Sequence, residues 1–106
     1  MNTKVIFVDI DNTICVSSSM DYKKAVPLHN RIAKINQLYE EGNTIVYWTA
    51  RGTQTGIDWH NVTKTQLQEW GVGYNELLFG KPSYDLFIDD KNIDSDTFFK
   101  DIKETV

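Results

Sequence analysis

Four short apolar runs, each followed by polar residues, constrain the fold of this 106-residue chain more than any other feature. The runs cover residues 5–8, 44–49, 77–79 and 86–88, and they are rich in β-branched and aromatic side chains. Each run is therefore predicted to be a strand. The first run is apolar throughout, which is typical of a strand covered on both faces.

Helical patterns alternate with these runs. Apolar residues spaced by three or four predict a helix over residues 28–39, ended by Gly42. A second helix is predicted from Asp58, and a final helix after Asp94. This order predicts an α/β fold with a Rossmann-like parallel sheet of about four to five strands flanked by helices. The length fits a single domain over residues 1–106.

Composition and charge exclude several functional classes. A single cysteine, Cys15, rules out an intrachain disulfide and favours the reducing cytoplasm. The net charge is -4 and lysines and arginines form no cluster, so nucleic acid is not expected as a partner. The N-terminal apolar run is interrupted by Asp9 and Asp11, which leaves it too short for a signal peptide or a membrane span. We therefore expect a cytoplasmic protein that binds neither nucleic acid nor membrane.

Polar side chains follow every predicted strand at its carboxyl end. They are Asp9 and Asp11, Thr49 and Arg51, Lys81, and Asp89 and Asp90, in chain order. Because the carboxyl ends of parallel strands meet at one edge of a sheet, these residues are expected to converge. Carboxylates that converge repel one another unless a cation lies among them, which predicts Mg²⁺ held by Asp9, Asp11, Asp89 and Asp90. Thr49, Arg51 and Lys81, together with Ala50 in the same segment, are expected to bind a phosphate group.

The two acids after the first strand are expected to have different roles. Asp9 is predicted to attack phosphorus and form an aspartyl-phosphate. Asp11 lies two residues further, on the same face of an extended chain, and is expected to protonate the leaving alcohol and then activate water. A carboxylate facing a phosphate dianion at about 4 Å costs about 8 kcal/mol at an effective dielectric of about 20, so the metal is mechanistically required.

These residues resemble the haloacid dehalogenase superfamily of phosphotransferases over nearly the whole chain. The family motif Asp-x-Asp-x-Thr corresponds to residues 9–13, its Thr or Ser to Thr49, its lysine to Lys81, and its acidic pair to residues 89–90. The resemblance implies a Mg²⁺-dependent phosphatase. Asn12 stands where the family commonly has glycine, and asparagine tolerates the left-handed backbone conformation that such a turn needs.

The cap domain usual in that superfamily has no counterpart in this sequence. The two positions where relatives insert it correspond to residues 14–27 and 52–57, and neither segment is long enough to form a domain. The chain is similar to small cap-less members linked to bacterial surface-polysaccharide biosynthesis, which implies a small sugar or polyol phosphate as substrate. We expect residues 14–27 to form a flap, and the chain either to close its site as a homo-oligomer or to act on a large substrate.

Three other functions fit parts of the pattern. A nucleotidase of the same superfamily shares the Ile-Asp-Asp-Lys ending of residues 88–91. A phospho-acceptor receiver module combines similar residues, but it places its acidic pair first in the chain, and a non-catalytic binding module would keep the fold alone.

Arg51 fits either a substrate-anion clamp or a surface salt bridge. His29 and His60 fall within predicted helices, so surface or packing roles are expected for them.

Overall fold

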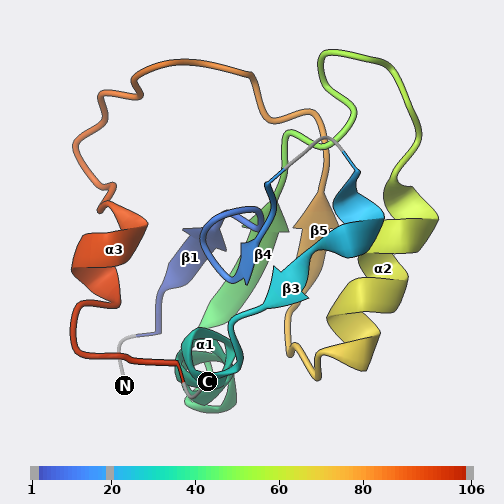
Figure 1. Ribbon diagram of the computed structural model, residues 1–106. Coiled ribbons are helices and arrows are strands. Elements are labelled where there is room, and N and C mark those ends of the chain that lie inside the picture. The colour runs from blue at the N-terminus through green and yellow to red at the C-terminus, as the bar shows by residue number, and fades with distance from the viewer. Residues whose placement is uncertain (1–2, 19–20, 105–106) are drawn as a thin grey trace.

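The computed structural model describes residues 3–18 and 21–104. A parallel sheet of three strands forms its centre, in the order β1 (Val5–Val8), β4 (Thr44–Trp48) and β5 (Glu76–Leu78) (Figure 1). The flanking helices are α1 (His29–Glu40), α2 (His60–Glu69) and the short α3 (Ser95–Phe98). The α/β class and the parallel arrangement expected from the sequence are confirmed.

The hydrophobic core lies on one face of this sheet. Ile45 and Tyr47 project from β4 into a cluster that includes Ile32 and Ile35 of α1 and Leu67 of α2. Alternate residues of a strand point to opposite faces, so the other residues of the sheet face away from both helices.

The prediction that residues 5–8 are covered on both faces is wrong. The side of β1 turned away from the core leaves Val5 exposed and Phe7 55% exposed. Phe7 keeps one aromatic neighbour, since its ring meets the edge of Trp48 at a centroid distance of 6.0 Å. The cause is the placement of α1 and α2, which both contribute to the core on the same side.

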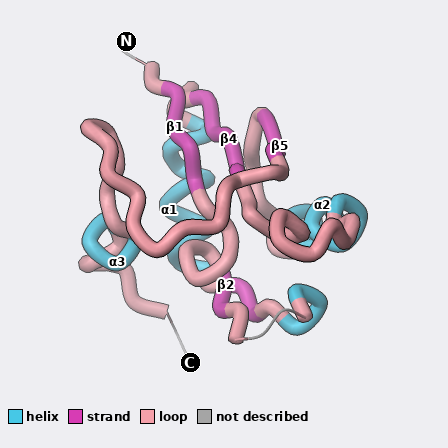
Figure 2. The backbone as a smooth tube through the Cα atoms, turned by 90° about the horizontal axis from the view of Figure 1, so that it is seen from above, coloured by secondary structure: helices cyan, strands magenta, loops and turns pink. Residues whose placement is uncertain are grey.

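Residues 86–88, predicted to be a strand, lie in a loop. The chain from 79 to 94 arcs from the β5 side of the sheet across to α3 on the β1 side (Figures 1 and 2). Leu86 and Ile88 are strongly exposed, Ile88 to 88%. A strand is stabilised by ladder hydrogen bonds to a neighbour, and the described sheet pairs β1 on one side only, with β4. The described sheet therefore has three strands instead of the four to five expected.

A small hairpin follows the carboxyl end of β1. β2 (Cys15–Val16) pairs antiparallel with β3 (Val26–Pro27), and the single turn η1 (Tyr22–Lys24) lies between them. Asn12, in the turn that leads into this hairpin, has φ of 61°, the left-handed conformation anticipated for it. The flap expected over residues 14–27 is therefore this hairpin, of which residues 19–20 lie outside the described residues.

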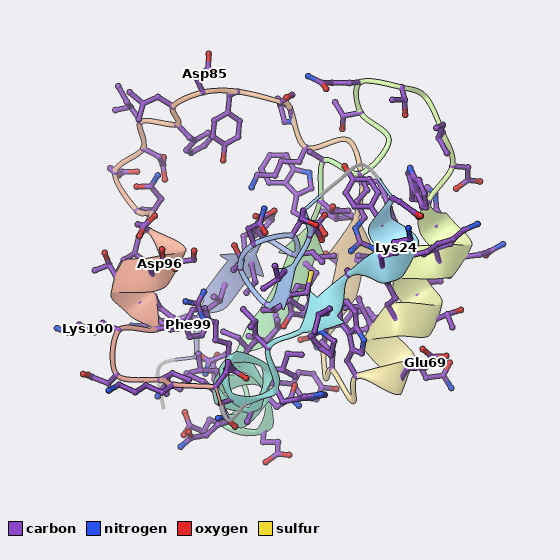
Figure 3. All side chains as sticks on the ribbon, in the orientation of Figure 1. Lys24, Glu69, Asp85, Asp96, Phe99 and Lys100 are labelled. Atoms are coloured by element: carbon purple, nitrogen blue, oxygen red, sulfur yellow. The ribbon has the colours of Figure 1, made fainter. Side chains whose placement is uncertain are left out.

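The final helix is shorter than the sequence pattern suggests. It ends at Phe98, although the apolar spacing extends to Ile102. Phe99 follows directly and turns into the core, where it is 3% exposed (Figure 3). Among the described residues, no helix has the length and apolar character needed to cross a bilayer.

Candidate active site

Asp9 and Lys81 form an ion pair at the carboxyl edge of the sheet. Asp9 follows β1, Lys81 follows β5, and Nζ of Lys81 lies 3.3 Å from Oδ1 of Asp9. The Asp9 side chain is 36% exposed, and Thr13 Oγ1 donates a hydrogen bond to its Oδ2 at 3.2 Å. The predicted nucleophile and the predicted lysine therefore lie together, and the carboxylate remains open to a ligand.

The turn after β4 places Lys81 opposite Asp9. The Thr49 amide donates to the Leu78 carbonyl, and the Lys81 amide donates to the Thr49 carbonyl. Thr53 Oγ1 also donates to the Lys81 carbonyl at 2.8 Å. These bonds continue the β4–β5 pairing past the ends of the strands and fix the backbone at Lys81.

Asp11 is bound by a buried arginine. Nε of Arg51 donates to Oδ2 of Asp11 at 2.9 Å, and Nη2 donates to Oδ1 at 2.8 Å. Ser17 in the hairpin adds a hydrogen bond from its Oγ to Oδ1 at 2.6 Å. The Arg51 side chain is completely buried, so its salt bridge is a buried one and not the surface salt bridge considered from the sequence.

The rest of the guanidinium is engaged by α2 and the hairpin. Nη1 of Arg51 donates to Thr63 Oγ1 at 3.0 Å and to Gln66 Oε1 at 2.6 Å. The Tyr22 ring lies 4.8 Å from the guanidinium carbon. The geometry therefore makes Arg51 a positioning residue for Asp11, and the substrate-anion clamp stays a prediction.

Thr63 and Gln66 were missed by sequence reasoning. They are three residues apart on α2, and both are buried beside Leu67. Two polar residues on the buried stripe of an amphipathic helix are the signal that could have identified them, because a buried polar side chain needs a partner.

Two further predicted phosphate-binding residues, Thr49 and Ala50, lie with Arg51 in the turn after β4. Thr49 is 1% exposed, and its Oγ1 accepts a hydrogen bond from the Arg51 amide at 3.1 Å. Ala50 is half-buried, and its carbonyl accepts from the Thr53 amide. The hydroxyl of Thr49 therefore shapes the turn that carries Arg51.

Asp89 and Asp90 are not placed beside Asp9 and Asp11. Both are exposed on the loop after β5, and Asp89 Oδ2 accepts from the Lys91 amide at 3.1 Å. Within residues 3–18 and 21–104, no group of three or more acidic, cysteine or histidine side chains is arranged to hold a metal ion. The four-carboxylate site expected from the sequence is therefore not assembled in this arrangement.

The donors that do converge still fit Mg²⁺ in part. Asp9 and Asp11 carry two negative charges, and Lys81 and Arg51 carry two positive charges, so the cluster is balanced by itself. Mg²⁺ commonly takes one or two carboxylates together with oxygens of a substrate phosphate and water. The open Asp9 carboxylate suits that mode, provided that a phosphate dianion or further acids balance the added charge.

A pocket opens next to this cluster. It has a volume of about 260 Å³ and lies between the 51–60 loop and residues 79–80. Arg51 belongs both to its wall and to the Asp11 ion pair, and Gly80 in the wall directly precedes Lys81. The pocket and the charged cluster are therefore linked through Arg51 and the 80–81 backbone.

Comparison with known proteins gives a structural neighbour. No family model matches the chain, and no curated protein matches it in sequence. The crystal structure of an MCSG target from Vibrio cholerae matches with a TM-score of 0.81 and 27% sequence identity, over 92% of this chain and 87% of that one. The α/β architecture described above therefore occurs in a solved structure of similar extent.

Proposed function

We propose that the protein is a Mg²⁺-dependent phosphomonoesterase of the haloacid dehalogenase superfamily, acting through an aspartyl-phosphate on a small phosphorylated metabolite. The observation that carries this proposal is the pair of Asp9 and Lys81, an open carboxylate 3.3 Å from an ammonium group at the carboxyl edge of a parallel sheet. A nucleophilic carboxylate has to be accessible, and a neighbouring cation attracts the phosphate that it attacks.

Charge repulsion is the main barrier that this site has to lower. The Asp9 monoanion and a phosphate dianion at about 4 Å repel by about 8 kcal/mol at an effective dielectric of about 20. Lys81 is close enough to Asp9 to attract the same phosphate and offset part of that repulsion. When bound at Asp9, Mg²⁺ supplies further positive charge against the phosphate oxygens.

The two carboxylates divide the chemistry. An oxygen of Asp9 attacks phosphorus while the bond from phosphorus to the alcohol oxygen breaks, and Asp11, which has taken up a proton before this step, gives that proton to the alcohol oxygen. Water then attacks the aspartyl-phosphate and gives its proton to Asp11, which releases phosphate and restores Asp9. Oδ2 of Asp11 accepts a hydrogen bond from Nε of Arg51, and each carboxylate oxygen has two lone pairs, so the second lone pair of Oδ2 can carry this proton.

The acidic pair reaches this site if residues 86–88 add to the sheet. The outer edge of β1 offers backbone hydrogen-bonding groups, and the apolar segment 86–88 is exposed on a loop that crosses to the β1 side (Figure 1). Pairing would give the fourth strand expected from the sequence and bring Asp89 and Asp90 toward Asp9. The added carboxylates repel Asp9 unless a cation binds, so strand pairing and Mg²⁺ binding are coupled in this proposal.

Amide hydrogen exchange tests that coupling. Adding Mg²⁺ is expected to slow exchange of the amides at residues 86–88, because ladder hydrogen bonds protect them. The Asp90→Asn variant is expected to need more Mg²⁺ for the same protection. Unchanged exchange at saturating Mg²⁺, in a protein that still releases phosphate, would eliminate the fourth strand from the account.

Release of inorganic phosphate tests the function itself. The wild-type chain with Mg²⁺ is expected to hydrolyse members of a panel of sugar, polyol and nucleoside monophosphates, and chelation with EDTA is expected to stop it. Asp9→Asn should abolish release, because an amide cannot form the acyl-phosphate, whereas Asp85→Asn on the outer loop is the matched control (Figure 3). A preference for nucleoside monophosphates would favour the nucleotidase alternative.

A further inference from the structure

Both oxygens of the Asp9 carboxylate have a partner, and one partner comes from the turn that follows β1. Lys81 lies next to Oδ1, and Thr13 Oγ1 donates a hydrogen bond to Oδ2 at 3.2 Å. The amides of Thr13 and Ile14 both donate to the Ile10 carbonyl, which closes this turn. The direction of the Asp9 carboxylate therefore depends on where the turn holds Thr13.

Arg31 of α1 binds that turn. Nη1 of Arg31 donates to the Thr13 carbonyl at 3.2 Å, and the Arg31 side chain is only 16% exposed. Two further contacts fix the guanidinium. Nη2 donates to Oδ1 of Asp96 at 2.9 Å, and the guanidinium carbon lies 4.8 Å from the centroid of the Phe99 ring (Figure 3). Three separate partners therefore order a long side chain that is otherwise rich in rotamers.

The C-terminal segment fixes the backbone of Arg31. Leu28 precedes α1, and its apolar side chain cannot cap the helix. Glu104 takes that role, since its Oε2 accepts the Arg31 amide at 3.0 Å and its Oε1 accepts the Asn30 amide at 2.9 Å. Asn30 Nδ2 also donates to the Lys103 carbonyl at 2.6 Å, which holds the segment at the start of α1 (Figure 1). A carboxylate is favoured there because the first-turn amides carry partial positive charge.

We propose that Arg31 is a positioning residue for the nucleophile, acting on Asp9 through Thr13, and that Glu104 anchors Arg31. This inference rests on the proposed phosphatase function. The attacking oxygen has to be aligned with phosphorus, and a displacement of about 1 Å costs about a hundredfold in rate. The bond from Arg31 to the Thr13 carbonyl opposes such a displacement, because the same residue donates its hydroxyl to Asp9.

The two arginines around the site should affect different steps of the reaction. Arg51 donates to both oxygens of Asp11, the acid–base group, whereas Arg31 acts on the Asp9 side through Thr13. Loss of Arg31 should therefore slow formation of the aspartyl-phosphate more than its hydrolysis, since water attack depends on Asp11. A residue that only stabilised the fold would leave both rates unchanged in the folded protein.

Rapid-quench measurement of a single turnover, with Mg²⁺ and a phosphomonoester that the chain hydrolyses, separates the two steps. Arg31→Gln is expected to lower the rate of aspartyl-phosphate formation at least about tenfold and that of its hydrolysis less than about threefold. Arg31→Lys keeps a cation that can donate to the Thr13 carbonyl, and it should recover most of the lost rate. The matched control is Lys34→Gln, which removes a positive charge three residues further along α1 and should behave as wild type. A wild-type rate in Arg31→Gln, or an equal loss in Lys34→Gln, would overturn the proposal.

A double-mutant cycle tests whether Arg31 acts through Thr13. Thr13→Val removes the hydroxyl that donates to Asp9 and keeps the carbonyl that accepts from Arg31, and it should slow aspartyl-phosphate formation about tenfold. Adding Arg31→Gln should slow this step by less than about twofold more, because the link to Asp9 is already broken. Losses that multiply would contradict the proposed route. If Arg31→Gln does not fold, Thr13→Val still decides the matter, because a wild-type rate in that variant would by itself refute the proposal.

Amide hydrogen exchange tests the hold of Arg31 on the turn without any turnover. Arg31→Gln should speed exchange of the Ile14 amide about tenfold, while the amides of β4 keep their wild-type rates. Unchanged exchange at Ile14, or equal acceleration in β4, would overturn the inference and leave the phosphatase proposal standing. Faster exchange at Ile14 in a chain that forms no aspartyl-phosphate would instead support the hold of Arg31 on the turn and refute the phosphatase proposal.

Discussion

Arg51 donates two hydrogen bonds to the Asp11 carboxylate, from Nε to Oδ2 at 2.9 Å and from Nη2 to Oδ1 at 2.8 Å. The arginine side chain is completely buried. The pair ties the turn after β4 to the turn after β1, and hydrogen bonds from Arg51 to Thr63 and Gln66 extend it to α2. One guanidinium therefore joins three elements around the candidate site.

Removal of the Arg51 guanidinium should lower the free energy of unfolding. Arg51→Gln leaves Asp11 partly buried without its cation, and breaking such a pair is expected to lower the free energy of unfolding by about 3 kcal/mol. The matched control is Asp96→Asn, which breaks an ion pair to Arg31 in which Asp96 is 83% exposed, and it should cost less than about 1 kcal/mol. Urea titrations of both variants give the comparison. Equal losses would show that burial of the Arg51 pair contributes nothing.

Removal of the Tyr47 hydroxyl should make the fold more stable. Its hydroxyl is buried in the core without a hydrogen-bond partner among the described residues, and burial raises the pKa of the phenol. An unsatisfied buried hydroxyl costs about 1–3 kcal/mol, so Tyr47→Phe is expected to raise the free energy of unfolding by about 1 kcal/mol. Tyr39→Phe, at a more exposed position, should stay within about 0.5 kcal/mol of wild type. A loss of stability in Tyr47→Phe would reveal a partner for the hydroxyl.

Cys15 should make the fold sensitive to alkali. Burial, followed by the nearby Asp11 charge, raises the pKa of the Cys15 thiol from 9.0 to about 11. The unfolded chain loses this proton first, so the contribution is fully present below pH 9.0 and is lost as the pH rises to about 11. The loss amounts to about 2–3 kcal/mol. Cys15→Ala should lose less stability than wild type between pH 8 and 11 in urea titrations, and parallel losses would contradict the shift.

Local patterns were sufficient to predict most of the elements. The apolar runs at residues 5–8 and 44–49 and the apolar stripe that includes Ile32 and Ile35 predicted β1, β4 and α1 with small errors at their ends. These patterns succeed because burial on one side of an element imposes its period on the sequence. The same reasoning failed for 86–88, because a strand depends on a partner that its own sequence does not specify.

The candidate site was predictable to a similar degree. Convergence of strand ends brought Asp9 and Lys81 together, as the topology of a parallel sheet requires. Partner choice within the cluster was not predictable, because the sequence pattern did not indicate that Arg51 would turn inward to Asp11 and α2. Thr49 likewise directs its oxygen to the backbone of its own turn. The homo-oligomer expected from the missing cap stays a prediction.

Trapping the phosphorylated enzyme tests the central claim most directly. Wild type is mixed with Mg²⁺ and a phosphomonoester that it hydrolyses, and the reaction is quenched in acid during turnover. The peptide that contains Asp9 is then expected to carry one phosphoryl group. Asp11→Asn should accumulate more of it, because water activation is lost. The account predicts that Asp9→Asn carries no phosphoryl group and releases no phosphate. Turnover by Asp9→Asn, or a phosphoryl group on any other residue, would contradict the assignment of Asp9 as the nucleophile.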